Sequence, residues 1–249
     1  MKTEIIAGPC SINSYEDLLE TAMAAKKAGA TAIRAGVLKP RTKPTSYQGL
    51  GIEGLECLAR VRDEVGLPIV TEARDVASVD AVAQVADIIQ IGSRNMQMYE
   101  LLTTVAKAAA KHERKVLLKR HFAANHTEIM GAIEYLKQYL PEEKIMFCER
   151  GIRTFENTYS RFTLDINIFP YWREHCPGIT IIADPSHSAG EAKYVPQIAL
   201  AALAAGAQGL LIEARVRPED EQCDRKQTID IPTLKQVVEL AGRMQYQTG

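Results

Sequence analysis

Several features that would fix the location or the partners of this chain are missing from its sequence. No apolar run reaches the roughly 18 to 20 residues that a membrane-spanning helix needs. The N-terminal run in MKTEIIAGPC is too short, and too interrupted by an acid, to be a signal peptide. The formal net charge of -1 gives no general attraction to nucleic acid or membrane. We therefore expect a soluble cytoplasmic protein that binds neither of them.

The sequence also lacks two motifs that are built on cysteine or glycine, the CxxC pair and a GxGxxG after the first apolar run. The five cysteines are an odd number, and none belongs to a CxxC pair, which argues against a disulfide framework and fits a reducing compartment. No GxGxxG motif follows the first apolar run, so a dinucleotide-binding sheet is disfavoured.

What the sequence does have is an alternation of short apolar runs with amphipathic, alanine- and leucine-rich stretches. Continuous apolar runs of this kind are typical of parallel strands buried on both faces. The expected strands cover residues 3–9, 31–37, 67–73, 87–93, 115–120, 144–150, 179–185 and 209–214. The expected helices lie near 15–29, 52–65, 75–85, 97–112, 126–139, 160–175, 191–205 and 231–244. This alternation predicts an α/β fold, the (β/α)8 TIM barrel, with an open doubly wound sheet as the alternative.

The whole chain is expected to form one domain. Barrels of this class routinely reach this length, and the sequence contains no linker or low-complexity tract. We therefore expect residues 1–249 to be a single catalytic barrel with no appended regulatory domain. The longest irregular segments, 38–51 and 214–230, are long enough to suggest a function for them.

Cations stand at most of the predicted strand ends, where the active sites of such barrels lie. They are Arg34, Lys39, Arg41, Arg94, Lys119 and Arg150. Cations gathered at one mouth repel one another unless anions bind among them, and arginine forks suit phosphate and carboxylate. The substrate should therefore carry several negative charges, as two phosphorylated molecules would.

A second set of strand-end residues has the chemistry of a metal site. It consists of Cys10, His187, Glu213 and Asp224. A thiolate, an imidazole and two carboxylates on separate strands could bind one divalent transition metal, which would polarise a carbonyl. Taken singly, Cys10 could be a small buried side chain and His187 a capping residue. Their coincidence at one face of the barrel favours the metal site.

The motifs around these residues resemble those of the 3-deoxy-D-arabino-heptulosonate 7-phosphate (DAHP) synthases, most of all the short single-domain type I branch. They are AGPCSI, IRAGVLKPRTKPTSYQGLG, TEARD, IQIGSRNMQ, LLKR, CERGIRTFE, DPSHSAG and LIEA followed by CDRKQT, in the family's order over residues 7–228. The resemblance implies a transferase that condenses phosphoenolpyruvate with D-erythrose 4-phosphate and releases phosphate. That reaction is the first step of the shikimate pathway of aromatic amino acid biosynthesis.

The resemblance also implies roles for individual residues. The metal ligands would be Cys10, His187, Glu213 and Asp224, holding manganese, iron, cobalt or zinc. The phosphoenolpyruvate site would comprise Arg94, Lys119 and Arg150, with Arg34 and Lys39 near its carboxylate and reacting carbon, Glu72 as an acid close by, and Ser93 supplying backbone. The erythrose phosphate would be held by Arg41 and Thr42. The candidates for moving protons are Lys39, Glu72, Lys119 and His187.

Three segments depart from the family's usual pattern. His121 follows LKR where the family usually has glycine, and EARVRPEDEQCD stands where the family reads EVHP. YSRFTLD replaces the usual TRNTLD. A bulky residue at a tight turn could reshape the loop beside Lys119. We expect these changes to affect the choice of aldose more than the type of reaction.

Three other functions remain open. A 3-deoxy-octulosonate 8-phosphate synthase would use arabinose 5-phosphate, but that family has an Asn-rich motif where this chain has KPRT. A Schiff-base aldolase using Lys119 would leave Cys10 unexplained. An inactive barrel would bind a phosphorylated metabolite without turnover. The resemblance further implies a homodimer or homotetramer, and a partner such as chorismate mutase is the hypothesis for feedback control.

Overall fold

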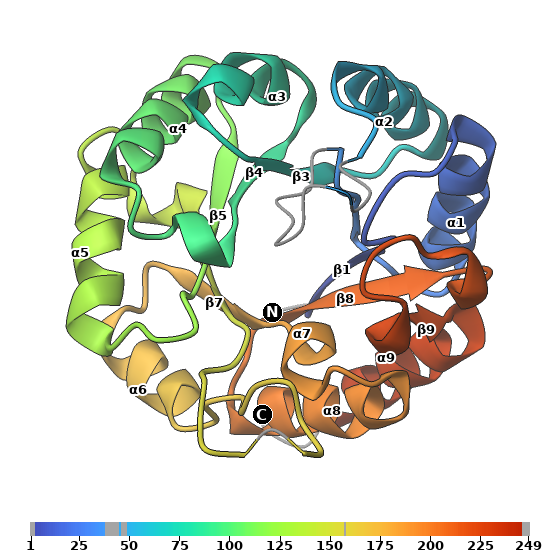
Figure 1. Ribbon diagram of the computed structural model, residues 1–249. Helices are drawn as coiled ribbons and strands as arrows, with labels where there is room; N and C mark the ends of the chain where they lie inside the picture. The colour runs from blue at the N-terminus through green and yellow to red at the C-terminus, as the bar shows by residue number, and fades with distance from the viewer. Residues whose placement is uncertain (1–2, 38–44, 46–48, 157, 246–249) are drawn as a thin grey trace.

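The computed structural model describes residues 3–37, 45, 49–156 and 158–245, and within them the predicted strands form a closed parallel barrel. The strands are β1 Glu4–Gly8, β2 Ala32–Arg34, β3 Ile69–Ala73, β4 Ile88–Ile91, β5 Lys115–Lys119, β6 Ile145–Glu149, β7 Thr180–Ala183 and β8 Gly209–Arg215. Each pairs with the next in sequence order, and β1 closes the barrel by pairing with β8. Figure 1 looks into this ring of strands.

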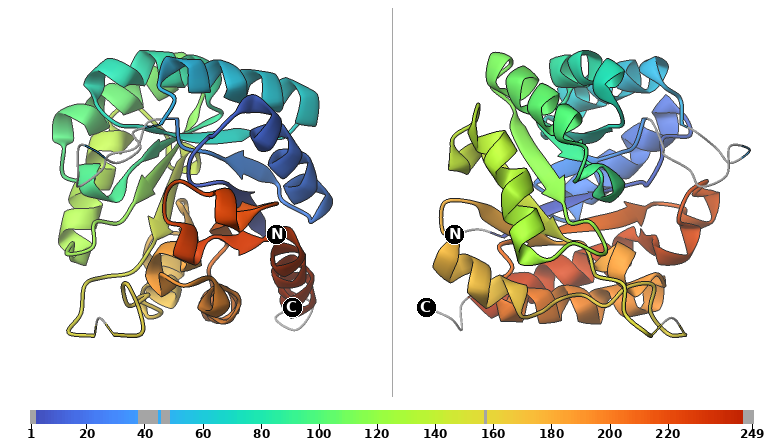
Figure 2. Two further views of the ribbon diagram at one scale, coloured as in Figure 1. Left: turned by 45° about the vertical axis from the view of Figure 1, so that its right-hand side comes forward. Right: turned by 60° about the vertical axis from the view of Figure 1, so that its left-hand side comes forward.

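Helices surround the barrel as expected of the (β/α)8 fold. They are α1 Tyr15–Lys27, α2 Ile52–Val65, α3 Val79–Val85, α4 Tyr99–Lys111, α5 His126–Lys137, α6 Ile168–His175, α7 Pro185–Ala189, α8 Val195–Ala205 and α9 Ile231–Gln245. A short strand, β9 Ile229–Asp230, follows the loop after β8. The two side views show the helices outside the sheet, and the segment between β6 and α6 projecting from the body (Figure 2). The TIM-barrel prediction is confirmed.

Two apolar layers explain why the strands read as continuous apolar runs. Inside the barrel pack Ile6, Ala32, Val70, Ile88, Leu117, Met146, Cys148, Ile182 and Leu211. The alternate side chains of the strands pack outward against the helices. On that outer face, Trp172 of α6 stacks on Phe147 of β6 with 4.4 Å between ring centroids. Both faces of each strand are therefore buried, which favours the parallel sheet.

Several element boundaries predicted from the sequence are wrong; the strand expected at 31–37, for example, covers only Ala32–Arg34. The helix expected at 160–175 begins only at Ile168, because Thr163 pairs in an antiparallel bridge with Ile152 and holds the preceding segment extended. The strand expected to reach residue 185 ends at Ala183, and the unpredicted helix α7 begins at once. Pro185 starts this helix and Asp184 caps it, so a local signal for it did exist.

Among the described residues, every helix is too short or too polar to cross a membrane.

Candidate active site

Three of the predicted metal ligands meet where the first and last barrel strands pair, a place we call the β1–β8 seam. Cys10 follows β1, Glu213 lies in β8, and Asp224 lies in the loop after β8. Parallel pairing sets Gly8 opposite Glu213. The thiol sulfur of Cys10 and one carboxylate oxygen each of Glu213 and Asp224 lie within 4.8 Å of one another. All three could therefore reach one metal ion.

The fourth predicted ligand, His187, reaches the same place from α7. Its Nε2 lies 3.8 Å from a carboxylate oxygen of Glu213 and 3.8 Å from one of Asp224. Its Nδ1 lies 2.8 Å from Oδ2 of Asp184, and its backbone N–H donates to Oδ1 of Asp184 at 2.9 Å. A carboxylate behind the ring is a common way to orient a metal-binding histidine. The apolar strand β7 is thus followed by Asp184 and His187, and the carboxylate of Asp184 orients the ring of His187 toward the β1–β8 seam.

The donor set at the seam fits a divalent transition metal. Cys10 and Glu213 are 1% and 2% exposed, so a bound cation would be attracted strongly in this poorly solvated place. Burial lowers the pKa of His187 against the opposing effect of Asp184, and the neutral imidazole is the form that binds metals. Asp224 has a φ of 55°, a left-handed conformation that is uncommon outside glycine and frequent at functional sites.

A buried carboxylate, Glu221, fixes the backbone beside Cys10. It accepts the backbone N–H of Cys10 at 2.9 Å, the backbone N–H of Ser11 at 3.2 Å and the Ser11 hydroxyl at 2.8 Å. Oε2 of Glu221 also lies 3.1 Å from Nη1 of Arg215, which is fully buried and pairs with Asp17 of α1. The charged loop after β8 is therefore tied to the end of β1 by ion pairs inside the protein.

Lys119, at the end of β5, forms an ion pair with Asp184. Its Nζ lies 2.5 Å from Oδ2 of Asp184, the same oxygen that faces His187. Burial alone would raise the pKa of Asp184, but the charges of His187 and Lys119 outweigh it and hold the pKa well below its ordinary range. Asp184 is thus a carboxylate that joins the predicted anion site to the predicted metal site.

Arg150, which follows β6, is a buried cation with unused donors. The residue is 4% exposed, and its Nε and Nη1 have no hydrogen-bond partner among the described residues. Its guanidinium carbon lies 3.9 Å from the ring centroid of Phe162. Arg120, by contrast, donates to Glu149, to Asp165 and to a backbone carbonyl. Arg120 is therefore occupied by the fold, whereas Arg150 is a buried cation with two donors that have no partner among the described residues.

Arg34 is held at the seam. Its Nη1 donates to the backbone carbonyl of Pro9 at 2.9 Å and to Oε1 of Glu213 at 3.2 Å. Burial alone would lower the pKa of Arg34, but Glu213 and its other acidic neighbours raise it above its ordinary value. The arginine therefore stays charged and offsets part of the negative charge of the ligand cluster.

The other predicted site residues described by the structure lie at the ends of β3 and β4. Glu72, in β3, accepts a hydrogen bond from Gln90 of β4 at 2.9 Å. Ser93 donates through Oγ to the backbone carbonyl of Arg120 at 2.6 Å, and Arg94 beside it is exposed. A Cβ atom on Gly92 would lie 2.1 Å from Oε1 of Glu72, so this carboxylate occupies space that only a glycine leaves open.

The predicted residues Lys39, Arg41 and Thr42 lie outside the described residues.

The family of the chain follows from comparison with known proteins. The DAHP synthetase I family matches residues 1–248. The chain belongs to this family. Membership agrees with the motifs of the sequence and confirms the predicted fold, family and enzyme class, a carbon–carbon bond-forming transferase.

Individual members of the family show how close the likeness is. Phospho-2-dehydro-3-deoxyheptonate aldolase of Thermotoga maritima is 43% identical over 237 residues, which cover 94% of this chain and 68% of that protein. The crystal structure of the DAHP synthase from that organism has a TM-score of 0.90 at 40% identity, over 97% of this chain and 68% of that one. Its truncated form has a TM-score of 0.86 at 38% identity, over 97% of this chain and 86% of that one.

The alternative family is more distant. The 2-dehydro-3-deoxyphosphooctonate aldolase of Nitratidesulfovibrio vulgaris is 33% identical over 238 residues, which cover 88% of this chain and 84% of that protein. The difference in identity agrees with the KPRT motif, which favours the seven-carbon reaction over the eight-carbon one.

Sequence reasoning did not select several residues that shape this DAHP synthase-family site. Asp184 had a signal, because an acid followed by proline at a strand end is a helix start. Glu221, Arg215 and Phe162 had none, because each acts through a partner far away in the sequence. Distant pairing of this kind leaves no local pattern.

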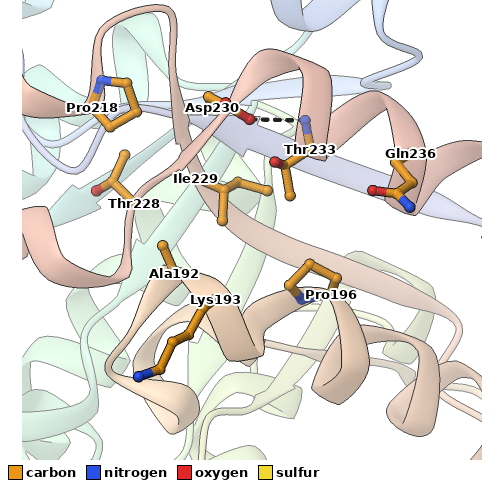
Figure 3. Close-up of a pocket in the computed structure, with 9 residues that line it drawn as sticks. All are labelled: Ala192, Lys193, Pro196, Pro218, Thr228, Ile229, Asp230, Thr233 and Gln236. Carbon is orange, nitrogen blue, oxygen red and sulfur yellow. Dashed lines mark hydrogen bonds between the residues drawn. The ribbon is translucent and has the colours of Figure 1, made fainter.

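A hollow of about 480 Å³ lies against the loop after β8, between the start of α8 and the start of α9 (Figure 3). Its lining is Ala192, Lys193, Pro196, Pro218, Thr228, Ile229, Asp230, Thr233 and Gln236. The charged groups in it are already paired: Asp230 accepts the backbone N–H of Thr233 at 2.9 Å, and Lys193 pairs with Glu191 at 2.9 Å. None of the predicted site residues lines it.

Proposed function

We propose that this chain carries out the reaction of its family, condensing phosphoenolpyruvate with D-erythrose 4-phosphate and water to give DAHP and inorganic phosphate. The observation that supports it most directly is the meeting of four donor side chains at the β1–β8 seam, beside the unused donors of Arg150. A metal site and an anion site side by side are what this chemistry needs.

The proposed metal ligands are Cys10, His187, Glu213 and Asp224, holding one divalent ion such as manganese, iron, cobalt or zinc. When bound, the ion polarises the aldehyde of the aldose. Asp184 keeps the His187 ring in place, and Glu221 keeps the Cys10 backbone in place.

The proposed anion site holds phosphoenolpyruvate through Arg150 and Lys119, with Arg94 at its rim. The ammonium group of Lys119 donates to Asp184, and from this position it can also reach the bound anion. Arg41 and Thr42 would hold the phosphate of the aldose. Fixing both anions brings carbon 3 of phosphoenolpyruvate to the aldehyde carbon, which supplies much of the rate.

Carbon 3 of phosphoenolpyruvate attacks the aldehyde carbon, and positive charge develops at carbon 2. Water adds at carbon 2, gives up a proton, and the hemiketal phosphate then loses phosphate as its carbon–oxygen bond breaks. Lys39, Glu72, Lys119 and His187 are the proposed proton carriers. Lys119 Nζ already lies in a hydrogen bond to Asp184, so it can donate to the oxyanion that forms on the aldose.

The test is phosphate release from phosphoenolpyruvate by metal-stripped protein, with erythrose 4-phosphate and arabinose 5-phosphate in parallel. We expect release only with erythrose 4-phosphate, restored by added manganese and lost in Cys10→Ala. Cys57→Ala is the matched control, because Cys57 lies on α2 and outside the site, and it should retain activity. Release with arabinose 5-phosphate would favour the eight-carbon synthase. Phosphoenolpyruvate binding without turnover under any of the metals would favour the inactive barrel.

The Schiff-base mechanism predicts a covalent adduct on Lys119. The amine already forms an ion pair with Asp184, which attack on a carbonyl would have to break. Treatment with borohydride in the presence of both substrates should therefore leave the mass of the protein unchanged. A stable adduct on Lys119 would contradict the proposed metal-dependent reaction.

We further propose that the enzyme works in a reducing cytoplasm as a homodimer or homotetramer, with chorismate mutase as a candidate regulatory partner. The compartment is supported by the five cysteines, all of which lie among the described residues and none of which forms a disulfide. A sedimentation measurement that finds only monomer would contradict the assembly. Kinetics that do not change when a mutase is added would contradict the partner.

A further inference from the structure

The surroundings of Arg150 raise a question that the family pattern does not answer. A buried cation normally needs a partner, because removing it from water is costly. Arg150 has unused Nε and Nη1 donors among the described residues, and burial lowers its pKa, with Asp184 only partly opposing the effect. Its close neighbour is the face of an aromatic ring, Phe162, with the guanidinium carbon 3.9 Å from the ring centroid.

That ring belongs to an array that joins two loops. Phe122, in the loop after β5, lies 5.9 Å from Phe162 and 4.1 Å from the ring of His121, measured between centroids. Arg153 lies over the Phe122 ring at 4.5 Å, and its backbone N–H donates to the carbonyl of Phe122 at 2.8 Å. The loop after β5 and the segment after β6 are therefore held together through aromatic contacts beside the anion site.

The array joins two segments that lie far apart in the sequence. His121 follows β5, and Phe162 lies between β6 and α6. The two positions meet through Phe122 in the fold, because its ring contacts both of theirs.

An aromatic face does something for an arginine that a carboxylate cannot. A carboxylate partner consumes N–H donors, as Glu149 and Asp165 do for Arg120. A ring attracts the cation through its face and leaves the edge of the guanidinium free to bind an anion. Gly151, with a φ of +94°, makes room for this arrangement, since a Cβ there would lie 2.7 Å from Cβ of Phe162.

We propose that Phe162 is a positioning residue that holds Arg150 by its face, so that the Nε and Nη1 edge binds an anionic group of phosphoenolpyruvate, and that His121 and Phe122 support this ring. This proposal rests on the proposed function, because it takes phosphoenolpyruvate as the anion. His121 and Phe162 then act together, through Phe122, in shaping the anion site.

The test compares two substitutions of the Phe162 ring with one control substitution in the metal-loaded enzyme. Phe162→Leu keeps an apolar side chain but removes the π face, Phe162→Tyr keeps the face, and Phe155→Leu is the control, because Phe155 is fully exposed in the same segment. We expect Phe162→Leu to raise KM for phosphoenolpyruvate by roughly three- to thirtyfold, the range of a cation–π contact. KM for erythrose 4-phosphate should change little, and Phe162→Tyr and Phe155→Leu should resemble the parent protein.

A purely structural role of the ring would give a different result. An unchanged KM for phosphoenolpyruvate in Phe162→Leu, or an equal rise in both KM values, would overturn the proposal. Calorimetric binding of phosphoenolpyruvate, without aldose, is measured on the same variants. A parent protein that binds phosphoenolpyruvate but releases no phosphate would contradict the proposed function alone. A parent protein that does not bind phosphoenolpyruvate would contradict both the proposed function and the role of Phe162.

The coupling has its own test in a double-mutant cycle of His121→Gly and Phe162→Asn, which removes the two rings singly and together. We expect each single variant to weaken phosphoenolpyruvate binding, and the double variant to weaken it less than the product of the two single effects. Effects that simply multiply would show that the two positions act independently, and would overturn this part of the proposal.

Discussion

At the scale of single residues, the site depends on close packing, and the contact between Gly92 and Glu72 is an example. A Cβ there would lie 2.1 Å from Oε1 of Glu72, and a flexible carboxylate can move away at little cost. Gly92→Ala should therefore lower kcat/KM by about a hundredfold, the effect of a displacement of about 1 Å in a catalytic group. The free energy of unfolding should change by less than about 1 kcal/mol, as for other mild changes of packing.

Gly131→Ala is the matched control for this prediction, because a Cβ at Gly131 in α5 meets nothing within 4 Å. It should retain activity and stabilise the helix by about 0.5 to 1 kcal/mol. Steady-state kinetics and chemical denaturation measure both variants. Full activity in Gly92→Ala would show that the position of Glu72 does not matter to the reaction.

Cys148, inside the barrel, should give the stability a pH dependence in the alkaline range. Burial raises the pKa of its thiol above the ordinary value of 9.0, an effect that Lys119 only partly opposes. Because the Cys148 thiol has the higher pKa in the folded protein, its contribution to the free energy of unfolding is fully present below pH 9.0. That contribution is lost as the pH rises above 9.0. At pH 10, one unit above the ordinary pKa of this thiol, its ionisation stabilises the unfolded chain by about 1.4 kcal/mol.

The comparison that isolates this effect is Cys148→Ala. The variant is less stable at all pH values because it leaves a cavity, but its free energy of unfolding should fall by about 1.4 kcal/mol less between pH 8 and pH 10. Denaturant unfolding under reducing conditions measures both slopes. Equal slopes would show that the thiol ionises in the folded protein as readily as in the unfolded one.

At the scale of elements, the loop after β8 is held by an ion pair inside the protein. Glu221→Gln removes the charge that faces Arg215 and weakens the hydrogen bonds to the Cys10 backbone. Arg215 keeps its ion pair with Asp17, so the loss of stability should stay below about 3 to 5 kcal/mol, the cost of a buried charge without any partner. Loss of a residue that orients a ligand costs about ten- to a hundredfold in metal affinity. Glu221→Gln should show both losses in denaturant unfolding and manganese titration.

Glu219→Gln is the control for the loop, because Glu219 is exposed in the same segment. It should change neither stability nor metal affinity. A Glu221→Gln protein that is less stable yet binds manganese with unchanged affinity would show that Glu221 supports the fold without positioning Cys10.

The elements also show how far the sequence alone reaches. The strands were predictable because each is an apolar run, and the candidate ligands followed from the strand ends of a barrel. The start of α6 was not predictable, since the bridge between Ile152 and Thr163 overrides the local preference of residues 160–167. The contact of Phe162 with Arg150 and that of Glu221 with Cys10 were not predictable either, because they exist only once the chain has folded.

At the scale of the whole molecule, the proposed metal would join the two ends of the barrel. Cys10 belongs to the first strand and Glu213 to the last, and their strands pair at the β1–β8 seam. Manganese at a hundred times its dissociation constant should therefore raise the free energy of unfolding by about 2.7 kcal/mol. Thermal unfolding with and without manganese measures the gain. Cys10→Ala should lose most of it, and a full gain in that variant would place the metal elsewhere.

The β1–β8 seam also sets an order of events during synthesis of the chain. The thiol of Cys10 and the carboxylate of Asp224 lie 3.6 Å apart in the fold but 214 positions apart in the sequence. Cys10 is therefore synthesised early, and most of the remaining chain must be made before the residues that lie next to it in the fold are present. Contacts between such distant positions form late, because a long loop must be closed first. A nascent or half-folded barrel lacks the proposed metal site, so binding of the proposed ion can only follow closure of the ring.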